Sequence, residues 1–250
     1  MTFVWDETVR QTRQMLESWT SKAVEHIPSI SKDTRTLSLN VLAATGFRRP
    51  YKFRSASEPR KIVDEAGSYR DALQTVLDNA IMLMVMPPKL LSLSFAPESW
   101  RHVARAAADF KKHMIRMLDE ETTYLNEGKS GSGGLMTSFV RALDMKQKED
   151  AKDNAGSPTP KGMTVDEIFG NIFEINFAGH DTTANTLAFS ILLLAAYPDV
   201  QDWVAEELQE LTPAHEKWEY SALFAKLKRC KAILVNPFCS LTQRSRGSFR

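Results

Sequence analysis

Apolar residues recur at helical spacing along most of this 250-residue chain. Between residues 164 and 196 they surround most of the helix circumference, from Val165 to Leu194, which is typical of a helix that crosses the middle of a domain. The polar residues in this run, among them His180 and Asp181, disfavour a membrane span. Helices are predicted over residues 3–26, 31–45, 65–86, 97–127, 133–149, 164–196, 198–211 and 219–235. The chain is therefore predicted to be all-α.

Residues at both ends of the longest predicted helix set its limits. Thr164 and Glu167 have the spacing of a capping box, with the threonine at the N-cap and the glutamate three residues later. Pro198 disfavours helix in the residue before it and can open a following helix, so the long helix is predicted to stop near Ala196. At roughly 1.5 Å per residue, its length is about 48 Å.

Glycine and proline mark the connections between the predicted helices. Gly46 is predicted to cap the end of the second helix. Pro87 and Pro88 break an apolar, methionine-rich run over residues 81–86. Residues 127–134 are predicted to form a flexible turn, and the charged residues 146–161, which include Pro, Gly and Ser, a linker.

The composition excludes several classes of protein. Lys and Arg number 32 against 31 Asp and Glu, so no electrostatic field favours nucleic acid or an anionic membrane. Two cysteines argue against a disulfide framework and suit a reducing compartment. The five histidines show no metal-ligand spacing, so no metal site is predicted. No N-terminal apolar stretch resembles a signal peptide or a membrane anchor.

The candidate site is the heptad Phe177–Thr183, in the middle of the long helix. A mid-helix glycine such as Gly179 costs about 1 kcal/mol relative to alanine, and Thr and Asp compete with the helix for backbone hydrogen bonds. Thr182 lies three residues after Gly179 and four after Ala178, so the three share one face, a small-residue gap with a hydroxyl at its edge. Asp181 is the residue before Thr182 and lies about 100° from it around the helix axis, and its carboxylate can take and return protons. The alternative is a kink or a satisfied buried polar cluster, and the spacing leaves both open.

Two adjoining motifs resemble those of the cytochrome P450 superfamily, the haem-thiolate monooxygenases. Ala-Gly-His-Asp-Thr-Thr over residues 178–183 matches the [AG]-G-x-[DE]-T-[TS] signature of the oxygen-binding I helix, and residues 197–208 resemble the J helix that follows it. Residues 4–11 and 37–47 resemble the D and E helices of fungal members. The resemblance covers about residues 1–235, from the D helix to the start of the K helix, as a partial domain with a long central I helix and with the β regions of the family largely absent.

The resemblance implies a haem cofactor and insertion of one oxygen atom from O2 into an apolar substrate. It gives Asp181 and Thr182 catalytic roles, in which Thr182 helps protonate bound dioxygen and Asp181 feeds protons to it. Ala178, Gly179 and Thr183 are then the cofactor-facing residues, and His180 occupies a variable position and is expected to pack or face solvent. The expected electron donor is an NADPH-dependent reductase. Full-length members lie on the cytosolic face of the endoplasmic reticulum membrane. Residues 81–86 correspond to a region that roofs the substrate pocket and can touch the bilayer, and a buried helix end with adaptable methionines is the alternative that the sequence leaves open.

Several landmarks of the family are not found. Neither Cys230 nor Cys239 lies in the F-x-x-G-x-R-x-C-x-G haem loop, and no tryptophan opens the W-x-x-x-R pattern of the C helix. The run before Val235 resembles the start of the K helix, but its E-x-x-R does not follow. Residues 236–250 are therefore expected to be an aberrant, disordered tail. A chain without an anchor is expected to be cytoplasmic, and a long helix stripped of apolar partners is expected to favour aggregation.

These observations leave alternatives open. The motifs favour descent from a haem-thiolate monooxygenase. The second possibility is that the chain as written is a catalytically inactive helical fragment, because the thiolate ligand and the E-x-x-R are missing. A lipophile-binding or regulatory protein without haem chemistry is the third alternative. Haem binding separates them.

Overall fold

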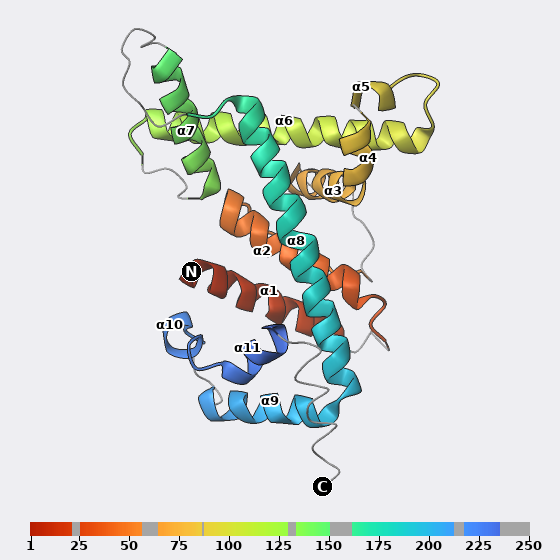
Figure 1. The fold of residues 1–250 in the computed structure, drawn as a ribbon, viewed down its shortest axis with the longest axis vertical. Helices are drawn as coiled ribbons and strands as arrows, with labels where there is room; N and C mark the ends of the chain where they lie inside the picture. Colours follow the sequence, from red (N-terminus) through yellow and green to blue (C-terminus); the bar gives the residue numbers. More distant parts are fainter. Residues whose placement is uncertain are drawn as a thin grey trace. The chain divides into compact units, whose positions relative to one another are not determined.

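The structure is a computed structural model that describes residues 1–21, 26–56, 65–86, 88–129, 134–150, 162–212 and 218–235. Every regular element in these ranges is a helix, which confirms the predicted all-α class. The helices are α1 (Thr2–Thr20), α2 (Ile30–Phe47), α3 (Glu65–Asp78), α4 (Ala80–Val85), α5 (Pro88–Leu91), α6 (Glu98–Asn126), α7 (Leu135–Asp150), α8 (Val165–Ala196), α9 (Pro198–Leu211), α10 (Tyr220–Leu223) and α11 (Lys228–Val235) (Figure 1).

The chain divides into two compact units. Unit 1 comprises Met1–Val41, Lys52–Glu58 and His180–Arg250, and unit 2 comprises Leu42–Tyr51 and Pro59–Gly179. Two helices therefore contribute to both units: α2 changes unit after Val41 and α8 after Gly179.

Unit 2 is built on α6, the amphipathic helix against which α3, α5 and α7 pack (Figure 1). Its buried face carries Val103, Phe110, Met114 and Leu118 at helical spacing. Gly128 ends the helix with a φ of 72°, and its N–H bonds to the Leu125 carbonyl oxygen at 3.1 Å while the Lys129 N–H bonds to that of Tyr124 at 3.2 Å. This pair of bonds is a Schellman motif, which needs a residue in the left-handed region.

Unit 1 combines apolar clusters with buried polar side chains. Met15, Leu37 and Phe53 form one cluster. Beside it the buried Asp33 carboxylate accepts hydrogen bonds from the Trp19 indole N–H at 2.7 Å and the Ala56 backbone N–H at 2.7 Å. Buried charge is tolerated here because it is hydrogen-bonded.

Most predicted helices are confirmed, but two are divided. The helix predicted over 65–86 separates into α3 and α4 at Asn79, whose φ is −116° and whose side-chain amide donates to the Thr75 carbonyl at 2.9 Å. The helix predicted over 219–235 separates into α10 and α11. The first N–H groups of α11 are capped by a side chain from α9, Glu207, so a new helix begins at Lys228.

Other boundaries also differ from the prediction. Gly46 is not a cap: α2 continues to Phe47, and Arg48 takes the left-handed conformation with a φ of 54°. A Cβ on Gly46 would lie 3.2 Å from the Leu135 side chain, so this position is kept small by packing against α7. The first helix ends at Thr20 rather than at residue 26, because Ser21 is extended. The first residues of the predicted linker 146–161 belong to α7, and its residues 151–161, like the predicted tail 236–250, lie outside the described residues.

Candidate functional site

The two ends of α8 are fixed as the sequence predicts. The Thr164 backbone N–H donates to the Glu167 carboxylate at 2.7 Å, and the Glu167 N–H donates to the Thr164 hydroxyl at 3.3 Å, which is a reciprocal capping box. Ile168 and Ile172 are fully buried in the following turns and anchor the helix in unit 2. At the other end, α8 stops at Ala196 and α9 opens at Pro198. The heptad therefore lies in a helix whose start and end are fixed by residues close to them in the sequence.

The predicted small-residue face of the heptad is exposed. Ala178, Gly179, Thr182 and Thr183 are all solvent-accessible, and α8 remains helical through them. His180 is buried, with 2% of its surface exposed, so it packs rather than facing solvent. A Cβ added to Gly179 would meet only the Leu42 side chain, at 3.5 Å, so the open space beside Gly179 belongs to an accessible surface.

Asp181 has a partner that the sequence did not reveal. Its Oδ1 lies 2.8 Å from Nε of Arg35 on α2, and both side chains are partly exposed, at 44% and 35%. The ion pair holds one oxygen of the carboxylate and leaves the group in contact with water. An ion pair at this exposure contributes little to stability, so its effect is mainly on the position of the carboxylate. No pattern in the sequence could identify Arg35, because the contact joins residues far apart in the chain.

Cys230 is the cysteine within the described part of the chain, and its surroundings keep it protonated. Burial and then the neighbouring Glu207 carboxylate raise the pKa of its thiol to about 11. The thiolate, and not the thiol, is the form of cysteine that ligates a metal. The other cysteine, Cys239, lies outside the described residues. No group of three His, Cys, Asp or Glu side chains suited to a metal ion occurs within the described ranges.

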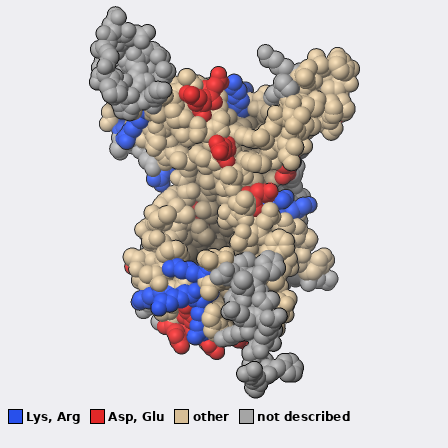
Figure 2. All heavy atoms as spheres, viewed as in Figure 1, with Lys and Arg blue, Asp and Glu red and all other residues tan. Residues whose placement is uncertain are grey.

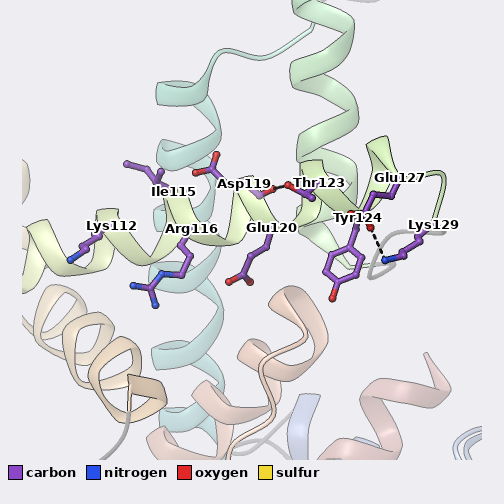
Figure 3. A pocket seen from close by; sticks show the side chains of 9 residues that line it. All are labelled: Lys112, Ile115, Arg116, Asp119, Glu120, Thr123, Tyr124, Glu127 and Lys129. Atoms are coloured by element: carbon purple, nitrogen blue, oxygen red, sulfur yellow. Dashed lines mark hydrogen bonds and ion pairs between the residues drawn. The ribbon is translucent and has the colours of Figure 1, made fainter.

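Unit 2 also carries surface cavities. A groove of about 640 Å³ follows one side of α6, and Figure 3 shows its lining side chains along the helix and the turn after it. Lys129 pairs with Glu127 at 2.6 Å, and the lining charges of both signs are solvated. An apolar pocket of about 280 Å³ lies between other faces of the unit. Its apolar lining includes Val76, Leu83, Phe110, Met114, Phe169 and Phe173.

Comparison with known proteins decides the family. The family model for Cytochrome P450 matches residues 6–228. The chain belongs to the cytochrome P450 family. Among curated relatives, it is 28% identical over 213 residues to cytochrome P450 monooxygenase prx9 of Penicillium rubens, which covers 82% of this chain and 34% of that protein. It is 27% identical over 238 residues to the phomenoic acid biosynthesis cluster cytochrome P450 monooxygenase of Leptosphaeria maculans, with 91% and 38% covered.

The fold agrees with this membership. The crystal structure of the cytochrome P450DA haem domain superposes with a TM-score of 0.65 at 19% identity, covering 94% of this chain and 44% of that one. The chain spans between 34% and 42% of the length of the curated relatives that cover most of it. The helical fold is therefore that of part of a haem domain.

The family implies haem, and the residues fit it unequally. The exposed strip of Ala178, Gly179 and Thr182 has no large side chain and can approach a flat ring. A thiolate ligand would also be needed, and Cys230 lies outside the haem-loop sequence pattern that carries this ligand in the family. The described residues thus offer a surface that a flat cofactor can approach, but no cysteine in the sequence context of the family's iron ligand.

Proposed function

We propose that this chain carries the oxygen-activation segment of a haem-dependent monooxygenase acting on an apolar substrate, with an NADPH-dependent reductase as electron donor. The observation that carries the proposal is the exposed face of α8, where a gap at Ala178 and Gly179 adjoins the Thr182 hydroxyl. Haem, when bound, supplies the binding and reduction of O2. The residues of the chain supply space and protons.

Thr182 and Asp181 have different roles in proton transfer. The Thr182 hydroxyl, exposed on the face shared with Gly179, holds a proton at the edge of the gap. The Asp181 carboxylate exchanges protons with water, to which it is 44% exposed, and Arg35 holds it at a fixed place on the helix. Ala178, Gly179 and Thr183 border the cofactor. A carboxylate in contact with solvent beside a hydroxyl that faces the gap is a short path for protons.

Contact of α4 with a membrane surface is a further part of this proposal. Ile81, Met84 and Val85 of α4 are each at least 72% exposed, and Phe95 is 84% exposed. In Figure 2 the surface over α4 carries neither Lys and Arg nor Asp and Glu colouring. Apolar side chains of this size are favoured at a lipid surface. Within the described residues, no individual helix has the length and apolar character of a membrane span; α8 and α9 meet those limits only as a pair bent by 109°.

A second candidate is a lipophile-binding protein without haem chemistry. The apolar pocket of about 280 Å³ in unit 2 favours it. This alternative needs the pocket and not the heptad.

Haemin titration of the purified chain separates the two candidates. A Soret band that saturates at one haemin per chain, and that weakens when Gly179→Val fills the gap, supports the monooxygenase segment. A Soret band that stays that of free haemin, with a fluorescent fatty acid still bound, supports the second candidate instead.

The role of Thr182 is tested in the haem-loaded protein with reductase and NADPH. Thr182→Ala is expected to divert the consumed NADPH into peroxide and to lower product formation roughly 10²-fold, the usual size of a general acid contribution. Thr186→Val is the matched control, because the Thr186 hydroxyl donates to the Thr182 carbonyl of the same helix at 2.9 Å. Equal peroxide release from both variants would remove Thr182 from the mechanism.

A further inference from the structure

A polar cavity of about 210 Å³ lies within unit 2, and the proposed oxygen chemistry uses none of its residues. It is formed where the connection after α2 meets α3 and α6. Its lining residues are Arg49, Tyr51, Tyr69, His113, Arg116, Met117 and Glu120. The cavity therefore gathers two guanidinium groups, two phenols and an imidazole around one carboxylate.

Tyr69 is the buried donor of this cavity. Its residue surface is 4% exposed, and its hydroxyl has no hydrogen-bond partner among the described residues. The ring meets the His113 ring edge-on, at 5.7 Å between centroids, and lies tilted by 30° against the Phe110 ring at 5.9 Å. Burial raises the pKa of the phenol above its ordinary value, so the hydroxyl keeps its proton at neutral pH. A buried hydroxyl without a partner is destabilising, and native proteins rarely retain one without a bound group.

Charged side chains line the same cavity as Tyr69. Arg49 and Arg116 are its guanidinium groups and Glu120 its carboxylate. Arg49 Nη2 also contacts Glu120 Oε2 at 2.6 Å, with both side chains nearly half exposed. An ion pair of this exposure is weak enough to share its guanidinium with a ligand. Figure 3 shows the Arg116 and Glu120 side chains on the same side of α6.

The charges define the class of ligand. With the imidazole neutral, Arg49 and Arg116 against Glu120 leave one net positive charge in the lining. Guanidinium groups hold carboxylate and phosphate oxygens in a planar, two-pronged geometry, and a phenol hydroxyl adds a donor. At about 30 Å³ for each water-sized group, the volume accepts a ligand of only a few non-hydrogen atoms.

We propose that this cavity binds a small oxyanion, a carboxylate or a phosphate group, through the Tyr69 hydroxyl and the guanidinium groups of Arg49 and Arg116. The ligand would satisfy the buried hydroxyl and balance the positive lining. The site is independent of haem and of the α8 heptad.

The test is an anion titration of the complete chain with acetate and with inorganic phosphate, each matched to chloride at equal ionic strength. Thermal unfolding and the NMR signals of ¹³Cζ-labelled tyrosine report binding. The unfolding temperature is expected to rise with anion concentration because only the folded chain binds. Tyr69→Phe removes only the hydroxyl and is expected to weaken binding at least about tenfold. Tyr124→Phe, at an exposed phenol on α6, is the control and is expected to bind as the unmodified chain does.

The two probes identify the source of the oxyanion, since tighter acetate binding indicates a carboxylate and tighter phosphate binding a phosphate. Equal effects of chloride and of both oxyanions would overturn the proposal, because they would reflect screening alone. Undiminished binding by Tyr69→Phe would overturn it as well. Should that variant not fold, Arg116→Gln with partial recovery in Arg116→Lys supports the site, and unchanged binding by Arg116→Gln refutes it.

Discussion

Two carboxylates in unit 1, Glu207 and Asp181, occupy opposite kinds of environment. Glu207 on α9 is buried and accepts backbone hydrogen bonds from Lys228, Arg229 and Cys230, at 2.8 to 3.1 Å. Asp181 on α8 is partly exposed and forms an ion pair with Arg35, while the buried His180 Nε2 lies 4.0 Å from the same oxygen, Oδ1. The same functional group thus serves as a helix cap in one place and remains accessible to solvent in the other.

The difference separates structure from chemistry. A carboxylate that accepts three backbone N–H bonds at a helix N-terminus is fixed by them and has no capacity left for a substrate. A carboxylate with one partner and access to water can exchange protons. The saturated Glu207 carboxylate therefore has a structural role, whereas the accessible Asp181 carboxylate can exchange protons, as its proposed role requires.

The largest effect is expected at the saturated carboxylate. Glu207→Gln replaces an acceptor oxygen with an amide that faces backbone donors, and is expected to lower the free energy of unfolding by about 2 kcal/mol in urea denaturation. Glu206→Gln is the control, because Glu206 is exposed and its ion pair with Arg229 at 2.8 Å is worth less than about 1 kcal/mol. Equal losses in both variants would contradict a capping role for Glu207.

Acid is expected to reduce the stabilisation that the Glu207 carboxylate gives by capping α11. Burial raises the pKa of Glu207, but the N–H donors of Arg229, Cys230 and Lys228 outweigh it, so the pKa lies below its ordinary value of 4.5. A lowered pKa gives stabilisation that is present above the unfolded-state pKa and lost as the pH falls through the folded-state value. The stability gap between the unmodified chain and Glu207→Gln should therefore be constant above about pH 5 and shrink below about pH 4. A gap that widens in acid would show that the pKa is raised.

Two glycines of α8 sharpen the contrast between stability and function. Gly170 has no neighbouring atom within 4 Å of an added Cβ, and Gly179 has only Leu42, at 3.5 Å. Alanine at either position should stabilise the chain by up to about 1 kcal/mol, because mid-helix glycine is unfavourable. Only Gly179→Ala should weaken haemin binding, since only Gly179 borders the gap. Matching haemin affinities in the two variants would argue against the gap as the cofactor face.

The smallest effect is expected at the accessible carboxylate. A double-mutant cycle with Arg35→Gln and Asp181→Asn should give a coupling free energy of about 0.2–1 kcal/mol that decreases with salt. Thermal unfolding at low and high salt measures it. A coupling free energy above about 2 kcal/mol would show that the Asp181 carboxylate has a structural role, as the Glu207 carboxylate does.

The local sequence was sufficient for α8, α9 and the heptad. The capping box at Thr164, the stop before Pro198 and the alignment of Ala178, Gly179 and Thr182 depend on residues within one or two helical turns. The family signature falls on the same residues, so fold class and candidate site followed from the sequence. The catalytic roles of Asp181 and Thr182 stay predictions.

Tertiary contacts decided what the pattern of residues does not record. The start of α11 depends on Glu207 from another helix, and the smallness of Gly46 depends on Leu135 rather than on helix termination. The partner of Asp181 and the buried hydroxyl of Tyr69 also arise between residues distant in the chain. Helix periodicity and caps are short-range and leave a trace in the sequence, whereas these pairings form only when the helices pack against one another.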